Sequence, residues 1–393
     1  MNPIFRSEIN KNVPLAKPDE FRPVTIGDFQ VWPPVVLAPM AGVTNAPFRR
    51  LCREFGAGLY VSEMVTSRFL ATREWYALKQ ATFAPDETPR SIQLYGTDPY
   101  FTGEAVKLLV NEERVDHIDL NFGCPVRKVT RKGGGAAIPL KPNLLRNIIR
   151  AAVQNAGSIP VTIKFRIGVS DEYPTHIATG KIAEGEGCAA VALHARTAAQ
   201  LYSGEARWEA IAELKNAVTT IPVFGNGDIW ESFDALRMMR QTGCDGVVVG
   251  RGCLGRPWLF RDLADVFNGR EPQQPPHLGE ALQIMLRHAE LLCDFFEERT
   301  AIPMFRKFCS WYVKGFFGEP DLRSRLVRVT TLSEMTSIVN EKERNEPYPL
   351  ASVREPRGKS GDPQKVALPP DYLNQLDDDT PPCAEAEDAT SGG

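Results

Sequence analysis

The feature that most constrains the fold of this 393-residue chain is a rhythm of short apolar, β-branched runs separated by amphipathic segments. The runs number eight and read VVLAPM (35–40), LYVSEM (59–64), SIQLYG (91–96), HIDLNFG (117–123), VTIKFRIG (161–168), AVALHART (190–197), PVFGNGD (222–228) and DGVVVGRG (245–252). Runs of this kind joined by helices are typical of parallel strands. Eight of them within about 220 residues favour an α/β fold of the (β/α)8 TIM-barrel type over a doubly wound sheet, which rarely needs eight units.

Segments of different composition follow one another along the chain. Residues 1–30 are polar and contain proline, which predicts an extended N-terminal lead-in, and 31–267 hold the predicted barrel. Residues 268–277 are predicted to be a linker, after which helical periodicity predicts an all-helical C-terminal domain over 278–345. Residues 346–393 turn to Pro, Asp, Ser and Gly, and we expect a disordered acidic tail because such a segment buries little apolar surface.

Composition excludes several classes of protein. The 46 basic and 49 acidic residues give a net charge of −3, so any nucleic-acid footprint must be local. The eight cysteines form no CxxC pair and no cluster at metal-ligand spacing, so we expect no metal site. The N-terminus lacks the apolar core of a signal peptide, and no apolar run approaches the ~20 residues of a membrane span. These features predict a cytoplasmic protein with reduced thiols that does not enter a membrane.

Polar residues at the ends of the predicted strands are the candidates for chemistry, because the active sites of such barrels lie there. The last two runs continue into GNGDIW (225–230) and GRGCLGRPW (250–258), where barrels commonly bind phosphate with backbone N–H groups. Tight turns alone would explain either stretch. Two of them, after strands seven and eight, favour a phosphate site.

Cationic side chains end two other strands. Lys164 shares one face of its strand with an arginine two residues later. Buried cations need an answering group, which could be an ion pair with Asp119 or Glu63, or a bound cofactor with a phosphate and an electron-rich ring. His194 and Arg196 also face the same way and are either bonded internally or a donor pair aimed at a substrate carbonyl.

A lone thiol stands at the end of the fourth run, in HIDLNFGCPVRKVTRKGGG (117–135). Gly-Cys-Pro ends this strand at Cys124, and the following residues carry four cations and three consecutive glycines. A free cysteine is usually a small buried hydrophobe. Its place at a strand end nevertheless makes Cys124 a candidate for chemistry.

Seven motifs together resemble a known family. They are PMAGVTNAPFR (39–49), VSEM (61–64), NFGCPVRKV (121–129) with RKGGGAA (131–137), KFRIG (164–168), HART (194–197), GNGDI (225–229) and GRGCLGRPW (250–258). In this order and spacing they resemble the bacterial tRNA-dihydrouridine synthases, closest to the B-type branch, over residues 30 to 340. The resemblance implies a TIM barrel that tightly binds the flavin FMN and reduces the C5=C6 bond of selected D-loop uridines in tRNA. It also implies that NADPH or NADH reduces the FMN again after each reaction.

The resemblance also implies roles for individual residues. Cys124 matches the proton donor of the family. The residues implied to bind the substrate are Asn121, His194 and Arg196, and we expect two of the cations after Cys124, Lys128 and Arg131, to bind it through the RNA phosphates. The residues implied to bind FMN are Pro39, Met40 and Ala41 along the ring, Gln93 and Lys164 by hydrogen bonds to it, and Asn226, Gly227, Asp228, Gly250 and Arg251 at the ribityl phosphate.

The implied reaction explains why a thiol would be needed. Reducing C5=C6 requires a hydride at C6 from one face and a proton at C5 from the other, so an acid must face the flavin across the uracil. A thiol with an ordinary pKa of about 8.5 is mostly protonated at neutral pH and can be that acid. The glycine triplet predicts a mobile loop that closes over a flipped-out base. Cations interleaved with aromatic residues over 306–328 predict helices that hold RNA.

Two other functions are compatible with parts of the pattern. A barrel flavoenzyme acting on a free pyrimidine would share the flavin chemistry but would not need the basic loop after Cys124 or the cationic helical domain. A tRNA-binding protein that has lost catalysis and acts as an RNA-folding chaperone is disfavoured, because Cys124, Lys164 and GNGD are intact. Whether the chain is a tRNA-modifying enzyme or a tRNA-binding protein without catalysis, we expect a monomer, which suits a partner of the size of tRNA.

Overall fold

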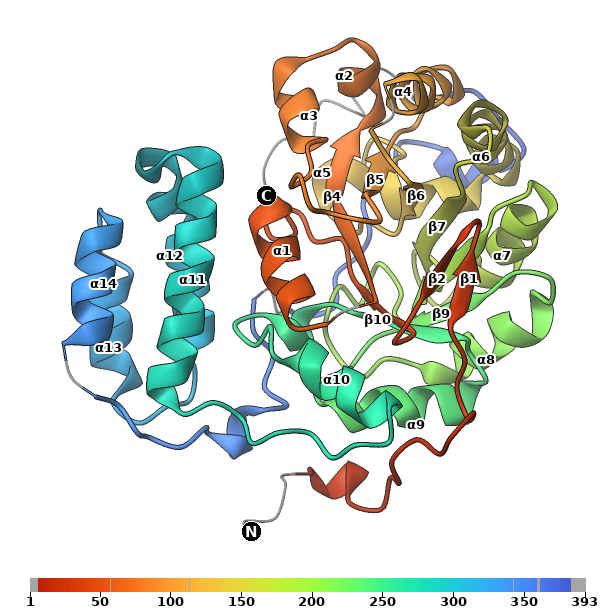
Figure 1. Cartoon of the computed structure of the whole chain (residues 1–393). Coiled ribbons are helices and arrows are strands. Elements are labelled where there is room, and N and C mark those ends of the chain that lie inside the picture. Colours follow the sequence, from red (N-terminus) through yellow and green to blue (C-terminus); the bar gives the residue numbers. More distant parts are fainter. Residues whose placement is uncertain (1–5, 57, 113, 342, 359–360, 383–393) are drawn as a thin grey trace.

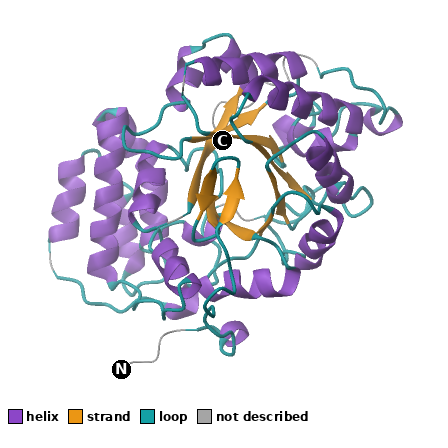
Figure 2. Ribbon diagram, turned by 45° about the vertical axis from the view of Figure 1, so that its right-hand side comes forward, coloured by secondary structure: helices purple, strands orange, loops and turns teal. Residues whose placement is uncertain are grey.

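The structure is a computed structural model that describes residues 6–56, 58–112, 114–341, 343–358 and 361–382. Its centre is a closed barrel of eight parallel strands in the order β10-β3-β4-β5-β6-β7-β8-β9 (Figure 1, Figure 2). The strands are β3 (Val35–Leu37), β4 (Leu59–Thr66), β5 (Ser91–Tyr95), β6 (His117–Phe122), β7 (Val161–Arg166), β8 (Ala190–His194), β9 (Val223–Asn226) and β10 (Gly246–Val249). Each predicted run forms one of these strands, so the predicted TIM barrel is confirmed.

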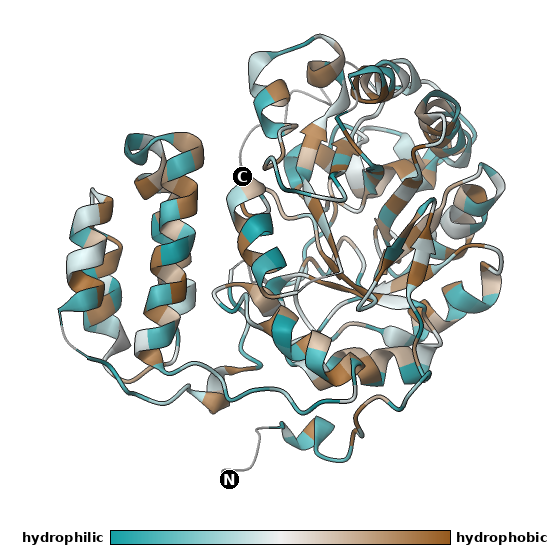
Figure 3. Cartoon of the chain, in the orientation of Figure 1, coloured by the Kyte–Doolittle hydropathy of each residue, from teal (hydrophilic) through white to brown (hydrophobic). Residues whose placement is uncertain are grey.

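Helices cover the outside of the barrel, as expected for segments with one apolar face to bury. They are α1 (Ala46–Glu54), α2 (Ser67–Ala71), α3 (Trp75–Gln80), α4 (Pro99–Asn111), α6 (Pro142–Ala156), α7 (His176–Gly185), α8 (Trp208–Ala217), α9 (Ser232–Thr242) and α10 (Leu259–Phe267), whereas the short α5 (Arg127–Thr130) follows β6 at the C-terminal end of the barrel. Figure 3 shows hydrophilic and hydrophobic residues together on these helices. The first helix starts at an ordinary cap, because Asn45 Oδ1 accepts a hydrogen bond from Phe48 N at 3.1 Å.

A small hairpin closes the barrel at the N-terminal ends of its strands. β1 (Val24–Ile26) and β2 (Phe29–Val31) pair antiparallel. Their inward side chains are buried against strand residues such as Phe224. The sequence predicts an extended lead-in here, and the hairpin was not foreseen because three-residue strands carry too little periodicity to read. Residues 1–5 lie outside the described residues.

Further helices stand beside the barrel, next to α1 (Figure 1). They are α11 (Leu278–Phe296), α12 (Glu298–Tyr312), α13 (Glu319–Leu326) and α14 (Leu332–Asn340). The ring centroid of Phe48 in α1 lies 5.1 Å from that of His288 in α11 and 6.2 Å from that of Phe308 in α12. Because these residues and the barrel share one continuous hydrophobic core, the predicted boundaries 31–267 and 278–345 stay a proposal. In the part of the chain that the structure describes, no helix has both the length and the apolar character of a membrane span.

The C-terminal segment differs from its predicted disorder. Residues 377–379 lie beside α6, because Asn143 Nδ2 donates to Asp377 O and Asn147 Nδ2 donates to Asp379 Oδ2, each at 3.0 Å, where the blue end of the chain runs in Figure 1. Val366 and Leu368 pack on a cluster that contains Ala137, Leu140 and Tyr372. The composition of a whole segment does not reveal that a few of its apolar side chains meet a preformed surface. Residues 383–393, also predicted to be disordered, lie outside the described residues.

Candidate active site

A cavity of about 330 Å³ opens at the C-terminal ends of the barrel strands. Its lining includes the predicted residues Pro39, Met40, Ala41, Gln93, Asn121, Cys124, Lys128, Lys164, His194, Arg196, Asn226, Gly227, Asp228, Gly250 and Arg251. Arg131, the residue after α5, is exposed and lies outside this lining. The fold therefore gathers residues from all parts of the barrel sequence at one site.

Aromatic residues complete the wall of the cavity. Tyr202 and Trp230 line it from the loops that follow β8 and β9, and Met64 lines it from β4. None of these three residues was predicted from the sequence as a site residue. Tyr202 and Trp230 are loop residues, which carry no periodic signal, and only the tertiary fold shows that all three turn toward the site.

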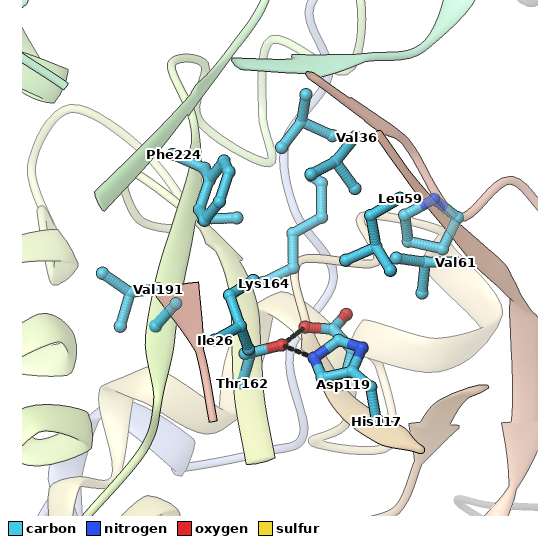
Figure 4. A pocket seen from close by; sticks show the side chains of 14 residues that line it. Ile26, Val36, Leu59, Val61, His117, Asp119, Thr162, Lys164, Val191 and Phe224 are labelled. Carbon is cyan, nitrogen blue, oxygen red and sulfur yellow. Dashed lines mark hydrogen bonds between the residues drawn. The ribbon is translucent and has the colours of Figure 1, made fainter. Parts of the chain in front are cut away.

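A chain of hydrogen bonds crosses the floor of the cavity. Asn121 Nδ2 donates to Gln93 Oε1 at 2.9 Å, and Gln93 Nε2 donates to Asp119 Oδ2 at 2.7 Å. Thr162 Oγ1 donates to the other carboxylate oxygen at 2.6 Å, and His117 Nε2 lies 2.9 Å from the same hydroxyl (Figure 4). Since the hydroxyl proton goes to Asp119, Nε2 of the histidine is the donor to Thr162. These bonds fix the amide orientations of Gln93 and Asn121.

Lys164 carries its charge into this buried region. Burial lowers the pKa of Lys164 to about 7, an effect that Arg166 strengthens and Asp119 opposes. Burial likewise raises the pKa of Asp119 to about 6, against the hydrogen bonds that its carboxylate accepts. Within the described residues, neither Asp119 nor Glu63 lies at ion-pair distance from the Lys164 ammonium. The structure therefore does not contain the ion pair between Lys164 and Asp119 or Glu63 that the sequence left open.

Cys124 is held on both sides by its own loop. Its N–H donates to Asn121 Oδ1 at 3.0 Å, and its carbonyl accepts from Ala136 N at 3.0 Å. The residue is 9% exposed and packs in a small apolar cluster with Tyr95. Because Asn121 bonds to Gln93 through the other end of its amide, the position of the cysteine is coupled to the hydrogen-bonded floor.

The glycine triplet after α5 forms a packed turn where the sequence predicts a mobile loop. All three glycines are buried. A Cβ atom on Gly134 would clash with the Tyr95 hydroxyl, and one on Gly135 would lie 2.5 Å from the Cys124 carbonyl oxygen. Gly135 also has φ of +56°, a left-handed conformation that glycine adopts without strain. Close approach to Tyr95 therefore explains Gly134, and close approach to the cysteine loop explains Gly135.

Arg196 is held by the protein itself. Its Nη2 donates to both carboxylate oxygens of Asp228, at 2.8 and 2.9 Å, and its Nε donates to Ser203 O at 3.1 Å. The residue is 2% exposed. Arg196, the first member of the expected donor pair, thus fixes the loop after β8. For the second member, His194, burial and the surrounding cations lower the pKa well below its usual value. The His194 ring is therefore neutral at pH 7.

The ends of β9 and β10 bring one cation, Arg251, to the cavity. Arg251 lies beside two aromatic rings, its guanidinium carbon 4.6 Å from the centroid of Tyr202 and 5.3 Å from that of Trp230. A Cβ atom on Gly250 would meet nothing closer than 3.7 Å, so this turn leaves room for a ligand. Burial lowers the pKa of Arg251. An anion bound here would favour its charged form.

Comparison with known proteins identifies the family. The family model described as dihydrouridine synthase (Dus) matches residues 36–346. The chain belongs to the dihydrouridine synthase family. The predicted resemblance is thereby confirmed.

Individual relatives agree with this assignment. A probable tRNA-dihydrouridine synthase of Mycobacterium leprae is 50% identical over 386 residues, covering 91% of this chain and 100% of the relative. The tRNA-dihydrouridine synthase B of Pseudomonas aeruginosa is 39% identical over 309 residues, covering 78% of this chain and 91% of the relative. Among solved structures, the old yellow enzyme of Trypanosoma cruzi is similar with a TM-score of 0.46 and 10% identity, over 66% of this chain and 94% of that chain.

The helical region of the chain contributes to the cavity in an unpredicted way. Tyr312 and Phe316, two aromatic residues of the stretch 306–328 that is predicted to hold RNA, are 2% and 3% exposed and belong to the core, whereas Phe317 is 91% exposed. Lys307 and Trp311 of α12 instead line the cavity, and Lys307 Nζ donates to a backbone carbonyl after β3 at 2.6 Å. Within the described residues, no group of three or more His, Cys, Asp or Glu side chains could hold a metal ion.

Proposed function

We propose that this protein reduces the C5=C6 bond of specific D-loop uridines in tRNA, with bound FMN as cofactor, NADPH or NADH as reductant and Cys124 as proton donor. The observation that carries the proposal is that Cys124 lines the same cavity as Lys164 and the glycine turns after β9 and β10. Membership of the dihydrouridine synthase family supports the reaction. The names of the relatives, which specify tRNA, support the substrate.

The cavity offers the contacts that FMN needs. The buried Lys164 ammonium lacks a carboxylate at ion-pair distance within the described residues and would gain a partner in the carbonyls of the flavin ring. Pro39 and Met40 give the wall beside it an apolar surface for a flat ring. Arg251 and the turns after β9 and β10 suit a phosphate. FMN bound in this way would supply the hydride that uracil C6 receives.

The residues of the chain would supply the proton and the alignment. Asn121 and Lys164 are neighbours in the β6–β7 register, so the hydrogen bond from the Cys124 N–H to Asn121 places the thiol at a fixed position relative to the lysine. From there Cys124 would donate its proton to C5 of the uracil. His194, neutral at pH 7, can donate a hydrogen bond to a uracil carbonyl without adding a charge to the site.

The proposed substrate must enter as an extruded base. A uridine within folded tRNA has to leave its stack to reach a cavity of this kind. Lys128 borders the cavity and Arg131 lies exposed beyond it, and we propose that these cations hold the neighbouring phosphates. Lys307 and Trp311 border the same cavity from α12, so both parts of the fold would contact the tRNA.

Mass spectrometry of tRNA fragments tests the proposal. Unmodified tRNA is incubated with the protein, FMN and NADPH, then digested and weighed. We expect a gain of about two mass units at a D-loop uridine, and a rate roughly 10²- to 10⁴-fold lower for Cys124→Ala because the proton donor is lost. Cys293→Ala, which changes a half-buried cysteine of α11, is the matched control and should retain the wild-type rate.

Two results would count against parts of the proposal. Equal rates for Cys124→Ala and the wild type would remove the cysteine from the mechanism. No mass gain in tRNA, combined with NADPH consumption upon addition of free uracil or uridine, would make the protein a small-molecule reductase.

A further inference from the structure

The described end of the chain forms a strap, which we define as residues 364–382. At its start, Gln364 N donates to Ala199 O in the loop after β8 at 2.9 Å. Toward its end, Asp378 forms an ion pair with Lys141 at 2.6 Å, and this interaction holds the pKa of Asp378 below its usual range. The family match ends at residue 346. The strap therefore lies beyond the part of the chain that the family model matches, and it connects two places on the barrel.

Tyr372 is the most buried described contact of this strap. The residue is 6% exposed, and its hydroxyl lies 3.2 Å from both Gly133 O and Ala137 O, to which its single proton is shared. Burial raises the pKa of Tyr372, so the hydroxyl keeps its proton and remains a donor at physiological pH. The Lys141 ammonium also lies 4.8 Å from the centroid of the Tyr372 ring. The side chain is thus fixed by a hydrogen bond, a cation and apolar packing.

The turn under Tyr372 is the turn that holds Cys124. Gly133 and Ala137, the two acceptors, bracket the residues that touch the cysteine. Between them, Ala136 N donates to the Cys124 carbonyl at 3.0 Å, and a Cβ on Gly135 would lie only 2.5 Å from the same oxygen. In such close packing, a shift of the turn cannot be absorbed without moving the cysteine loop.

A second connection joins the same loops from inside the barrel. Arg166 Nε donates to Gly123 O at 2.9 Å, and its Nη1 donates to Leu201 O at 2.8 Å. The loop after β6 and the loop after β8 are therefore tied together twice. Arg166 forms the inner tie and the strap, through Ala199 and Tyr372, forms the outer one.

We propose that the strap positions Cys124 for proton transfer, with Tyr372 as a positioning residue that acts through the turn 133–137. The inference rests on the proposed function, because it assigns the strap to the proton-donating half of that reaction. Tyr372 does not line the cavity. Its removal should therefore change the placement of the thiol while leaving the cofactor contacts of Lys164 and Arg251 in place.

Tyr372→Phe removes only the hydroxyl and is the decisive variant. Tyr100→Phe, at a residue of α4 that is 67% exposed, is the matched control. The first readout is the rate at which iodoacetamide alkylates Cys124 in the tRNA-free protein, measured on its peptide with Cys293 as internal reference. The second compares dihydrouridine formation with NADPH oxidation by oxygen in the absence of tRNA.

We expect Tyr372→Phe to form dihydrouridine about fivefold more slowly, as the loss of one hydrogen bond implies, with NADPH oxidation within about twofold of wild type. Alkylation of Cys124 should become several-fold faster because the loop is released. Asp378→Asn, which weakens the anchor at Lys141, should shift both readouts in the same direction. Tyr100→Phe should shift neither.

The outcomes separate this inference from the proposed function. Wild-type rates of both alkylation and dihydrouridine formation in Tyr372→Phe would overturn it. A parallel fall in NADPH oxidation, product formation and melting temperature would also overturn it, because the strap would then only stabilise the fold. If the wild type makes no dihydrouridine, the proposed function fails, while the alkylation rates still decide whether the strap holds Cys124.

Discussion

At the scale of single residues, Lys164 is the clearest case of a side chain whose surroundings are incomplete without a ligand. Its ammonium is desolvated by the barrel, and Arg166 nearby adds repulsion. A charge in such a place is unfavourable unless an anionic or carbonyl group approaches it. We interpret the lowered pKa as a consequence of holding the lysine in a buried position where it can contact a cofactor. On this interpretation the lysine serves the function of the protein rather than its stability.

Replacing this lysine should therefore separate stability from cofactor binding. Lys164→Met removes a hydrogen bond from a charged donor, worth about 1.5–3 kcal/mol, so FMN affinity should fall roughly 10- to 100-fold. In the protein freed of FMN, the folded chain loses the lysine proton near pH 7, whereas the unfolded chain keeps it to the ordinary value of 10.5. The unfolded state binds more protons between these values, so this group makes stability rise with pH across that window.

Urea unfolding at several pH values checks the second expectation, and fluorescence titration with FMN checks the first. The difference in unfolding free energy between wild type and Lys164→Met should become larger in favour of the wild type as pH rises above 7. Lys17→Met, at an exposed residue of the N-terminal segment, is the control. A pH-independent difference would show that Lys164 is not charged in the way its burial implies.

Motifs identify which residues form this site but not how they are paired. Arg196 and Asp228 were each predicted from a strand end, and both line the cavity. Their ion pair, in which Nη2 of Arg196 donates to both carboxylate oxygens of Asp228, depends on the loop after β8, which places Ser203 beside the same guanidinium. No local pattern in HART or GNGD contains that information, because the two partners come from different strands.

At the scale of elements, the N-terminal hairpin supports the site from below. Ile26 of β1 lines a small cavity of about 30 Å³ that also borders Lys164 and Asp119 (Figure 4). With Ile26 and Val31 at 2% and 0% exposure, the hairpin separates these charged groups from solvent at the closed end of the barrel. The burial that shifts the pKa of Lys164 thus depends on an element far from the active-site opening.

Shortening a buried side chain of this hairpin should weaken the fold. Ile26→Ala should lower the unfolding free energy by about 2–5 kcal/mol, since it deletes buried methyl groups next to an existing cavity. Chemical denaturation measures the change. Thr25→Ala, at the exposed neighbour on the same strand, should cost less than about 1 kcal/mol. Equal losses for the two variants would mean that the hairpin does not seal the barrel.

Elements differed in how well the sequence predicted them. The barrel strands were predictable because each is a β-branched apolar run buried on both faces, a pattern that depends on local sequence alone. The hairpin and the strap were not, since their few apolar residues gain burial only from a surface formed by other elements. Tyr372, within a stretch rich in proline and aspartate, has no local feature that predicts its 6% exposure.

At the scale of the whole molecule, the helical region and the barrel act as one body around the cavity. His288 of α11 is fully buried, its ring centroid 4.7 Å from that of Phe308 and 5.1 Å from that of Phe48. Burial lowers the pKa of His288 to about 3, so the contact stays neutral and apolar across the physiological range. A tRNA would therefore meet a preformed surface shared by α12 and the barrel loops, with no hinge at the predicted linker required.

The overall charge of −3 means that tRNA affinity must come from a few well-placed cations rather than from a general positive field. Arg131→Gln removes an exposed charge near the cavity. If Arg131 contacts one phosphate, the slope of log K for tRNA binding against log salt concentration should become less steep by about 0.7–0.9. Filter binding of tRNA between low and moderate salt measures this slope, and NADPH oxidation without tRNA should not change. Arg22→Gln, exposed just ahead of the hairpin at the opposite end of the barrel, should keep the wild-type slope. Identical slopes for all three proteins would place the tRNA backbone elsewhere, because an exposed cation that neutralises no phosphate releases no counterion.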